Sequence, residues 1–119
     1  MTYTHLSAGI SDAEWFRRAL NEASLDPVGM WQMVKAGREG FGLSGADLEK
    51  FVARFMQTLI EGGANPIIGD RSAPFGWAAI DKYGNNAGEI VKSLVAEWRK
   101  NGIDPDVDGV WFALPSVWM

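Results

Sequence analysis

The chain has 119 residues with 11 basic and 15 acidic side chains and one histidine, so its formal net charge is −4. This length is typical of one domain, and we expect residues 1–119 to form a single globular domain. The lack of cysteine excludes disulfides, thiolate nucleophiles and thiolate metal sites. The negative charge disfavours a phosphate backbone, so we expect no nucleic acid as a partner.

The first ten residues have neither the basic start nor the long apolar run of a secretory signal. No uncharged stretch approaches the length of a membrane span, so we expect no membrane partner and a cytoplasmic location. His5 lies in this N-terminal stretch, which we expect to be loose and without a role in function.

Apolar side chains recur at helical spacing in four parts of the chain. The first part opens with a capping box, in which Ser11 accepts from the Glu14 amide and the Glu14 carboxylate reaches back to the Ser11 amide. The clearest stripe runs from Leu48 to Ile60. The first two predicted helices cover about 12–24 and 27–39. The third begins after the cap Ser44 and ends at Gly62, and the fourth begins after the cap Asn86 and ends at Gly102.

The apolar period changes after residue 64. Short apolar runs at 66–69, 76–80 and 110–114 read as strands, and Pro115 is expected to stop the last one. The chain is therefore predicted to be α+β, with about four helices packed against a small antiparallel sheet in a single compact domain.

Residues 40–45 reproduce the glycine spacing of a dinucleotide-binding fingerprint. The preceding residues are polar and helical rather than a buried strand, so a glycine-rich turn is the preferred interpretation. A weaker alternative remains, in which the free amides of 44–47 and the nearby Arg38 hold an anion.

The segment 104–109 resembles the first half of a calcium loop, with Asp104, Asp106 and Asp108 at alternate positions. Pro115 stands where such a loop needs a bidentate glutamate, so a true EF-hand is not expected. The open alternatives are a solvated turn, an acidic patch that faces a basic partner, and weak calcium binding completed by other carboxylates.

Six tryptophans are many for this length. Three lie on or near helical apolar faces and are expected in the core: Trp15, Trp31 and Trp98. The other three lie in strand or irregular regions, where core packing, sugar stacking and an interface role all remain open: Trp77, Trp111 and Trp118. Catalytic chemistry has little support, and the most site-like polar pair is Asp70-Arg71 in a loop, with a surface turn as the simpler interpretation.

Several short stretches between residues 40 and 115 together resemble a group of small, poorly characterised bacterial proteins. They are 47–55, 63–66, 83–84, 89–91, 96–98 and 109–115. Some members of this group resemble the immunity partners of polymorphic or contact-dependent toxins. The resemblance implies a small cytoplasmic domain that binds another macromolecule, and it carries over no functional residue.

The leading hypothesis is a non-enzymatic protein-binding module, and its specific form is an immunity-type inhibitor of a basic toxin domain. We expect no catalytic, cofactor-binding or metal-binding residue. The expected interface comprises Asp104, Asp106, Asp108, Trp111, Trp118 and Trp77. The alternatives are a small-molecule or carbohydrate-binding module that uses Trp77 and Trp111, and a small enzyme with a carboxylate and arginine site at Asp70 and Arg71.

Overall fold

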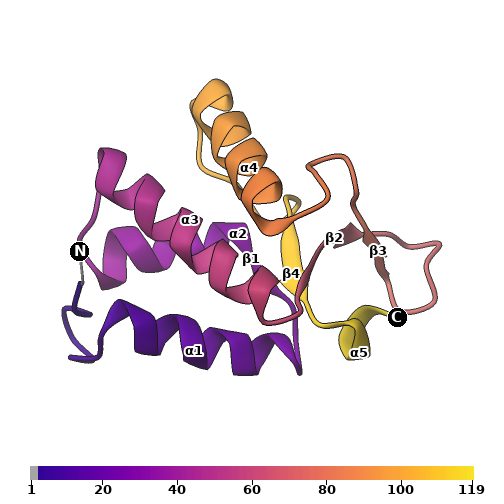
Figure 1. Cartoon of the computed structure of the whole chain (residues 1–119), viewed down its shortest axis with the longest axis horizontal. Coiled ribbons are helices and arrows are strands. Elements are labelled where there is room, and N and C mark those ends of the chain that lie inside the picture. The colour runs from indigo at the N-terminus through magenta and orange to yellow at the C-terminus, as the bar shows by residue number, and fades with distance from the viewer. Residues whose placement is uncertain (1–2) are drawn as a thin grey trace.

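The computed structural model describes residues 3–119 (Figure 1). This part of the chain folds into five α-helices, one π-helical segment and a four-stranded sheet. The helices are α1 (Asp12–Ala23), α2 (Met30–Lys35), α3 (Gly45–Glu61), α4 (Ala87–Asn101) and α5 (Pro115–Trp118), and the π-helical segment is η1 (Ala36–Gly40). The strands are β1 (Val28–Gly29), β2 (Asn65–Gly69), β3 (Trp77–Ala79) and β4 (Trp111–Ala113). The predicted α+β class, with about four longer helices and a small antiparallel sheet, is confirmed.

Helix α3 is the centre of the helical layer, and α1, α2 and α4 pack around it (Figure 1). Its predicted apolar stripe forms the middle of the core. Six side chains of α3 are buried: Leu48, Phe51, Val52, Phe55, Met56 and Leu59. Full burial of one such side chain stabilises the fold by roughly 1.5–3 kcal/mol, so this helix organises the molecule.

The sheet has the strand order β1-β4-β2-β3, and every neighbouring pair is antiparallel. Alternate residues of a strand point to opposite faces. Phe112 is fully buried and belongs to the helix-side core, so Trp111 beside it faces the other way. Ile67 pairs with Trp111 and lies on that second face. Across the described residues, no helix combines the length and apolar content that a bilayer crossing requires.

The predicted second helix over 27–39 is wrong at its start. Val28 and Gly29 form strand β1 and pair with Phe112 and Trp111 of β4. The helix begins only at Met30, after the Gly29 amide donates to the Gln32 side chain at 2.8 Å. A side chain at position 29 would lie 2.7 Å from the Trp31 ring, which explains why glycine lies at this crossing of strand and helix.

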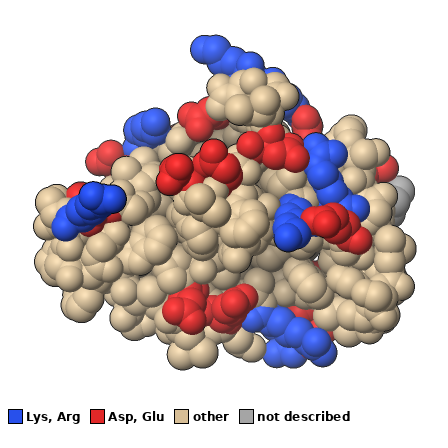
Figure 2. All heavy atoms as spheres, turned by 180° about the vertical axis from the view of Figure 1, so that it is seen from behind, with Lys and Arg blue, Asp and Glu red and all other residues tan. Residues whose placement is uncertain are grey.

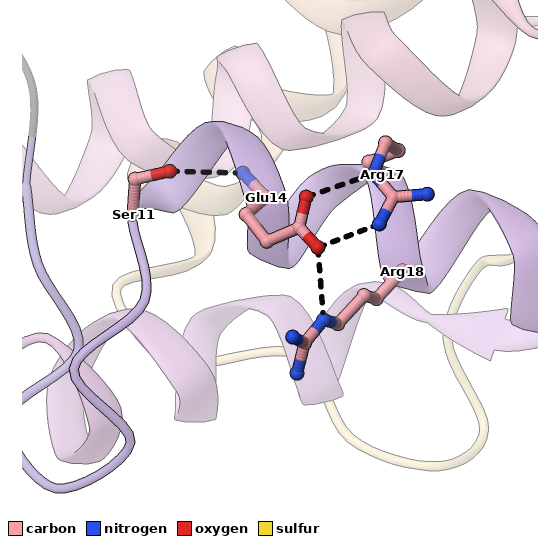
Figure 3. A network of polar contacts seen from close by, with 4 residues as sticks. All are labelled: Ser11, Glu14, Arg17 and Arg18. Atoms are coloured by element: carbon pink, nitrogen blue, oxygen red, sulfur yellow. Dashed lines mark hydrogen bonds and ion pairs between the residues drawn. The ribbon is translucent and has the colours of Figure 1, made fainter.

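The capping box before α1 is only half formed. Ser11 Oγ accepts from the Glu14 amide at 3.2 Å, as predicted (Figure 3). The Glu14 carboxylate turns instead to Arg17 and Arg18, with bonds of 2.6 and 3.1 Å (Figure 3). The hydrogen bonds from Arg17 and then Arg18 lower the pKa of Glu14 to about 2. The Glu14 carboxylate therefore binds the guanidinium groups of Arg17 and Arg18 instead of the Ser11 amide, since charge-assisted hydrogen bonds are the stronger ones.

Residues 3–10 are packed rather than loose, which corrects the expectation for His5. Its ring stacks on Trp15 with centroids 4.7 Å apart, and its Nδ1 accepts from the Ala8 amide at 2.9 Å. The Leu6 amide donates to the Gly40 carbonyl at 2.7 Å. The segment thus lies against the η1 end of the helical layer.

Pro115 stops β4 as predicted, but it also opens a helix. It is the first residue of α5, where its fixed backbone angle and missing amide proton are tolerated. The C-terminus therefore lies beside the β2–β3 end of the sheet (Figure 1).

Candidate functional site

A groove of about 520 Å³ lies between α4, the loop 102–110 that follows it, Ile68 of β2 and the segment 80–83 that follows β3. This volume is within the range of about 300–1,000 Å³ typical of ligand pockets. The apolar side chains that line it are Met30, Ile68, Ile80, Leu94, Ile103 and Val110. The loop descends beside α4 to reach β4 (Figure 1), and its side chains line one side of this groove, which is named the acidic groove.

Four carboxylates and one ammonium line the acidic groove: Glu97, Asp104, Asp106, Asp108 and Lys82. The charged groups stand beside an apolar floor, and the side chains of Ile103 and Val107 on the same loop are 74% and 56% exposed. Exposed apolar side chains among charges are a common composition of protein-binding surfaces.

Asp104, a predicted interface residue, is held by contacts within the chain. It accepts from Arg38 Nε at 2.9 Å, from Arg38 Nη2 at 3.0 Å and from Trp98 Nε1 at 3.2 Å. The Arg38 hydrogen bond is the main cause of the lowered pKa of Asp104, and it outweighs burial. Asp104 therefore fixes the loop to η1 and α4. The guanidinium of Arg38, which the anion-site alternative required, is bound to Asp104 instead.

Asp106 and Asp108 form the turn at the tip of the loop. Asp106 Oδ1 accepts from the Asp108 amide at 2.9 Å, and the Asp106 carbonyl accepts from the Gly109 amide at 3.0 Å. Both carboxylates are exposed. Over residues 3–119, no three His, Asp or Glu side chains gather closely enough to hold a metal ion. The tip is a compact acidic turn at the mouth of the groove.

Tyr83 and Glu97 meet inside the acidic groove, and sequence reasoning singled out neither for a site. The Tyr83 hydroxyl donates to Glu97 Oε1 at 3.1 Å, with Oε2 at 3.3 Å. Burial, followed by the charge of Glu97, raises the pKa of Tyr83 to about 12, so the phenol stays a donor at neutral pH. Lys82 Nζ lies 5.1 Å from the centroid of the Tyr83 ring. No local pattern signals this arrangement, because Glu97 lies on α4, 14 residues after Tyr83 in the chain.

Two of the predicted interface tryptophans, Trp77 and Trp111, lie on the opposite face of the sheet. The ring centroids of Trp77 and Trp111 are 5.5 Å apart, and those of Trp31 and Trp111 are 6.4 Å apart. Trp118 lies half-buried on α5. The described groove lining includes neither Trp77, Trp111 nor Trp118. One link to the groove remains, because Trp111 Nε1 donates to the carbonyl of Val107 at 2.9 Å.

The Asp70-Arg71 pair lies in a tight surface turn between β2 and β3. Asp70 Oδ1 accepts from the Ser72 hydroxyl at 2.6 Å and from the Ser72 amide at 2.9 Å. The Ser72 hydroxyl is the main cause of the lowered pKa of Asp70. Asp70 thus acts as a turn-forming side chain in this structure.

The sequence matches no family model, no curated protein and no solved structure. The interpretation of the acidic groove therefore rests on its geometry, its charge and its exposed apolar side chains.

Proposed function

We propose that this chain is a non-enzymatic protein-binding module that receives a basic partner in the acidic groove. The supporting observation is the combination of an apolar floor with the carboxylates of Glu97, Asp106 and Asp108, beside the exposed Ile103 and Val107. Complementary charge speeds encounter between proteins, and burial of apolar anchors slows release.

The charge that supports this proposal is local. On the face seen in Figure 2, acidic and basic side chains are interspersed and separated by broad uncharged areas. A net charge of −4 spread in this way favours basic partners only weakly over the whole molecule. A surface that contains several carboxylates and one lysine, as the acidic groove does, attracts a cationic segment more strongly.

The specific form of the proposal is an immunity-type inhibitor whose partner is a basic toxin domain. The resemblance of residues 40–115 to a group of small bacterial proteins, some of which resemble immunity partners, supports it, as does the acidic groove. Trp111 then holds the loop in place from the opposite face of the sheet, through its hydrogen bond to the Val107 carbonyl. Trp77 packs beside Trp111. The test is growth of bacteria that express a basic toxin domain encoded beside this protein, with and without this chain. Rescue of growth is expected, and full toxicity in its presence would contradict the immunity role.

The binding role has a more general test that needs no identified partner. A short fluorescent peptide of alternating arginine and leucine serves as the probe, and a peptide of alternating glutamate and leucine is the control. Binding of the basic peptide alone is expected, with affinity that falls as salt is raised. Equal binding of the acidic peptide, or no binding of either, would contradict the proposal.

The acidic groove itself is tested by a matched pair of double variants. Asp106→Asn with Asp108→Asn removes two negative charges at the loop tip and should weaken binding of the basic peptide. Glu22→Gln with Asp26→Asn removes the same charge near the end of α1, outside the groove lining. The second pair should leave the affinity nearly unchanged, and equal weakening by both pairs would show that only net charge matters.

A further inference from the structure

We propose that the acidic groove is built to receive one arginine side chain of the partner, with its guanidinium on the carboxylate of Glu97. This inference rests on the function proposed above and names the chemical group that the groove selects. Tyr83 is assigned the part of a positioning residue, because it holds that carboxylate without neutralising it.

The carboxylate of Glu97 is fixed but not saturated. The Tyr83 hydroxyl supplies a single proton, which is shared between oxygens at 3.1 and 3.3 Å. A carboxylate offers about four lone-pair positions, so both oxygens retain acceptor capacity. Glu97 is exposed whereas Tyr83 is 9% exposed, which places the charge at the surface of the groove on a buried support. Two free acceptor positions on one carboxylate match the paired donors of a guanidinium.

The groove also fits the stem and the plane of an arginine. Ile80, Leu94 and Ile103 provide an apolar lining along which a methylene stem can lie. The indole of Trp98 lines the same groove, and its bond to Asp104 at 3.2 Å fixes its orientation. Guanidinium groups stack on aromatic rings more readily than ammonium groups do.

The chain already places a cation of its own against an aromatic ring of this groove. The Lys82 ammonium lies over the Tyr83 ring, 5.1 Å from its centroid. Lys82 itself is exposed, so its flexible stem allows it to move when a stronger cation enters. The groove therefore already accommodates one positive charge beside an aromatic ring.

The experiment compares three fluorescent peptides that alternate leucine with lysine, except that one central basic position carries arginine, lysine or citrulline. Citrulline keeps the shape of arginine but carries no charge. With the wild-type chain, the arginine peptide should bind at least about tenfold more tightly than the citrulline peptide, which is the scale of one hydrogen bond to a charged group. It should also bind more tightly than the lysine peptide.

The variants Glu97→Gln and Tyr83→Phe identify the groups responsible. Glu97→Gln, at an exposed position, should abolish the preference for arginine over citrulline. Tyr83→Phe should reduce the preference for arginine over lysine while the charge at Glu97 remains. Glu22→Gln, outside the groove, is the control and should change neither ratio.

The outcomes separate this inference from the function on which it rests. If the basic peptides bind with salt-dependent affinity but citrulline replaces arginine without loss, or Glu97→Gln keeps the preference, the arginine site is wrong and the basic-partner proposal stands. If no basic peptide binds at any salt concentration, the function proposed above fails, and the arginine site fails with it.

Discussion

Arg38 and Asp104 are separated by 66 residues in the chain and are joined by two hydrogen bonds of 2.9 and 3.0 Å. The first residue lies in η1, within the helical layer, and the second lies in the loop after α4. This pair, together with the bond from Trp98, sets the position of the loop whose tip carries Asp106 and Asp108. The shape of the acidic groove therefore depends on the contact between Asp104, which lines it, and Arg38, which does not belong to the lining.

Replacement of Arg38 by alanine should loosen the loop at little cost in global stability. Both side chains are nearly half exposed, at 45% and 43%, and an exposed ion pair contributes up to about 1 kcal/mol to the free energy of unfolding. Amide hydrogen exchange at Val107 and Asp108 should become faster. Arg99→Ala, which removes a comparable surface pair with Glu49, is the control and should leave that exchange unchanged. Unchanged exchange in Arg38→Ala would contradict the positioning role of the pair.

The contribution of this pair should also depend on pH with a definite sign. Because the folded-state pKa of Asp104 is lowered from its usual 3.8, the stability it adds is present above that value and is lost as pH falls through the folded pKa. The difference in free energy of unfolding between wild type and Arg38→Ala should therefore be constant near neutrality and shrink in acid. A difference that grows in acid would contradict this assignment.

Asp12 should be the more sensitive carboxylate for stability, because its side chain is fully buried. Burial raises its pKa, but the hydrogen bonds from Arg54, Ala13 and Tyr3 outweigh that effect and lower it overall. Asp12→Ala removes the 2.8 Å ion pair with Arg54 and should cost about 1.5–3 kcal/mol in chemical denaturation. The exposed Asp26→Ala is the control and should stay within about 0.5 kcal/mol of wild type. An equally small effect for Asp12→Ala would show that the buried pair adds nothing.

Two glycines should differ in how much stability they lose when replaced by alanine. A methyl group on Gly37, in η1, would lie 2.5 Å from Leu48 and 2.9 Å from Phe51, so Gly37→Ala should cost about 1–3 kcal/mol through overpacking. The nearest atom to a methyl group on Gly88, in α4, is 3.4 Å away, and Gly88→Ala should stay within about 0.5 kcal/mol of wild type. Thermal unfolding of both variants measures the contrast, and equal melting temperatures would contradict the packing described around η1.

Lys82→Gln should strengthen binding of the arginine–leucine peptide severalfold. The substitution removes the basic side chain that lines the acidic groove, and with it a like-charge repulsion toward the peptide. Lys92→Gln makes the same charge change at an exposed position of α4 outside the groove lining and should have a smaller effect. Fluorescence anisotropy at low salt measures both affinities. Weaker binding to Lys82→Gln would contradict the repulsion between Lys82 and the basic peptide.

Local patterns were sufficient to predict much of the fold. The helical spacing from Leu48 to Ile60 predicted α3, and the short apolar runs at 66–69, 76–80 and 110–114 predicted three of the strands, β2, β3 and β4. Strand β1 carried no such signal, because two residues show no period and their partners lie more than 80 positions away in β4. Pairing with β4 overrode the helix that Pro27 suggested.

The candidate site was predictable only in part. The acidic run from Asp104 to Asp108 was visible in the sequence, and its three carboxylates line the acidic groove. Its role toward a basic partner stays a prediction. The hydrogen bonds from Arg38 to Asp104 and from Tyr83 to Glu97 depend on how α4 packs against the rest of the fold. No local spacing in the sequence reveals that packing. The interface role of Trp77, Trp111 and Trp118 stays a prediction. Trp77 and Trp111 lie on the face of the sheet opposite the groove, and Trp118 lies on α5.

The most direct test of the central claim is to map the bound arginine–leucine peptide by NMR on the ¹⁵N-labelled chain. The account predicts shifts of amide signals that concentrate at Ile80, Glu97, Asp106 and Val107, and that disappear when salt is raised. Shifts concentrated around Trp77 or along α1, or no shifts at low salt, would show that the acidic groove does not bind a basic partner.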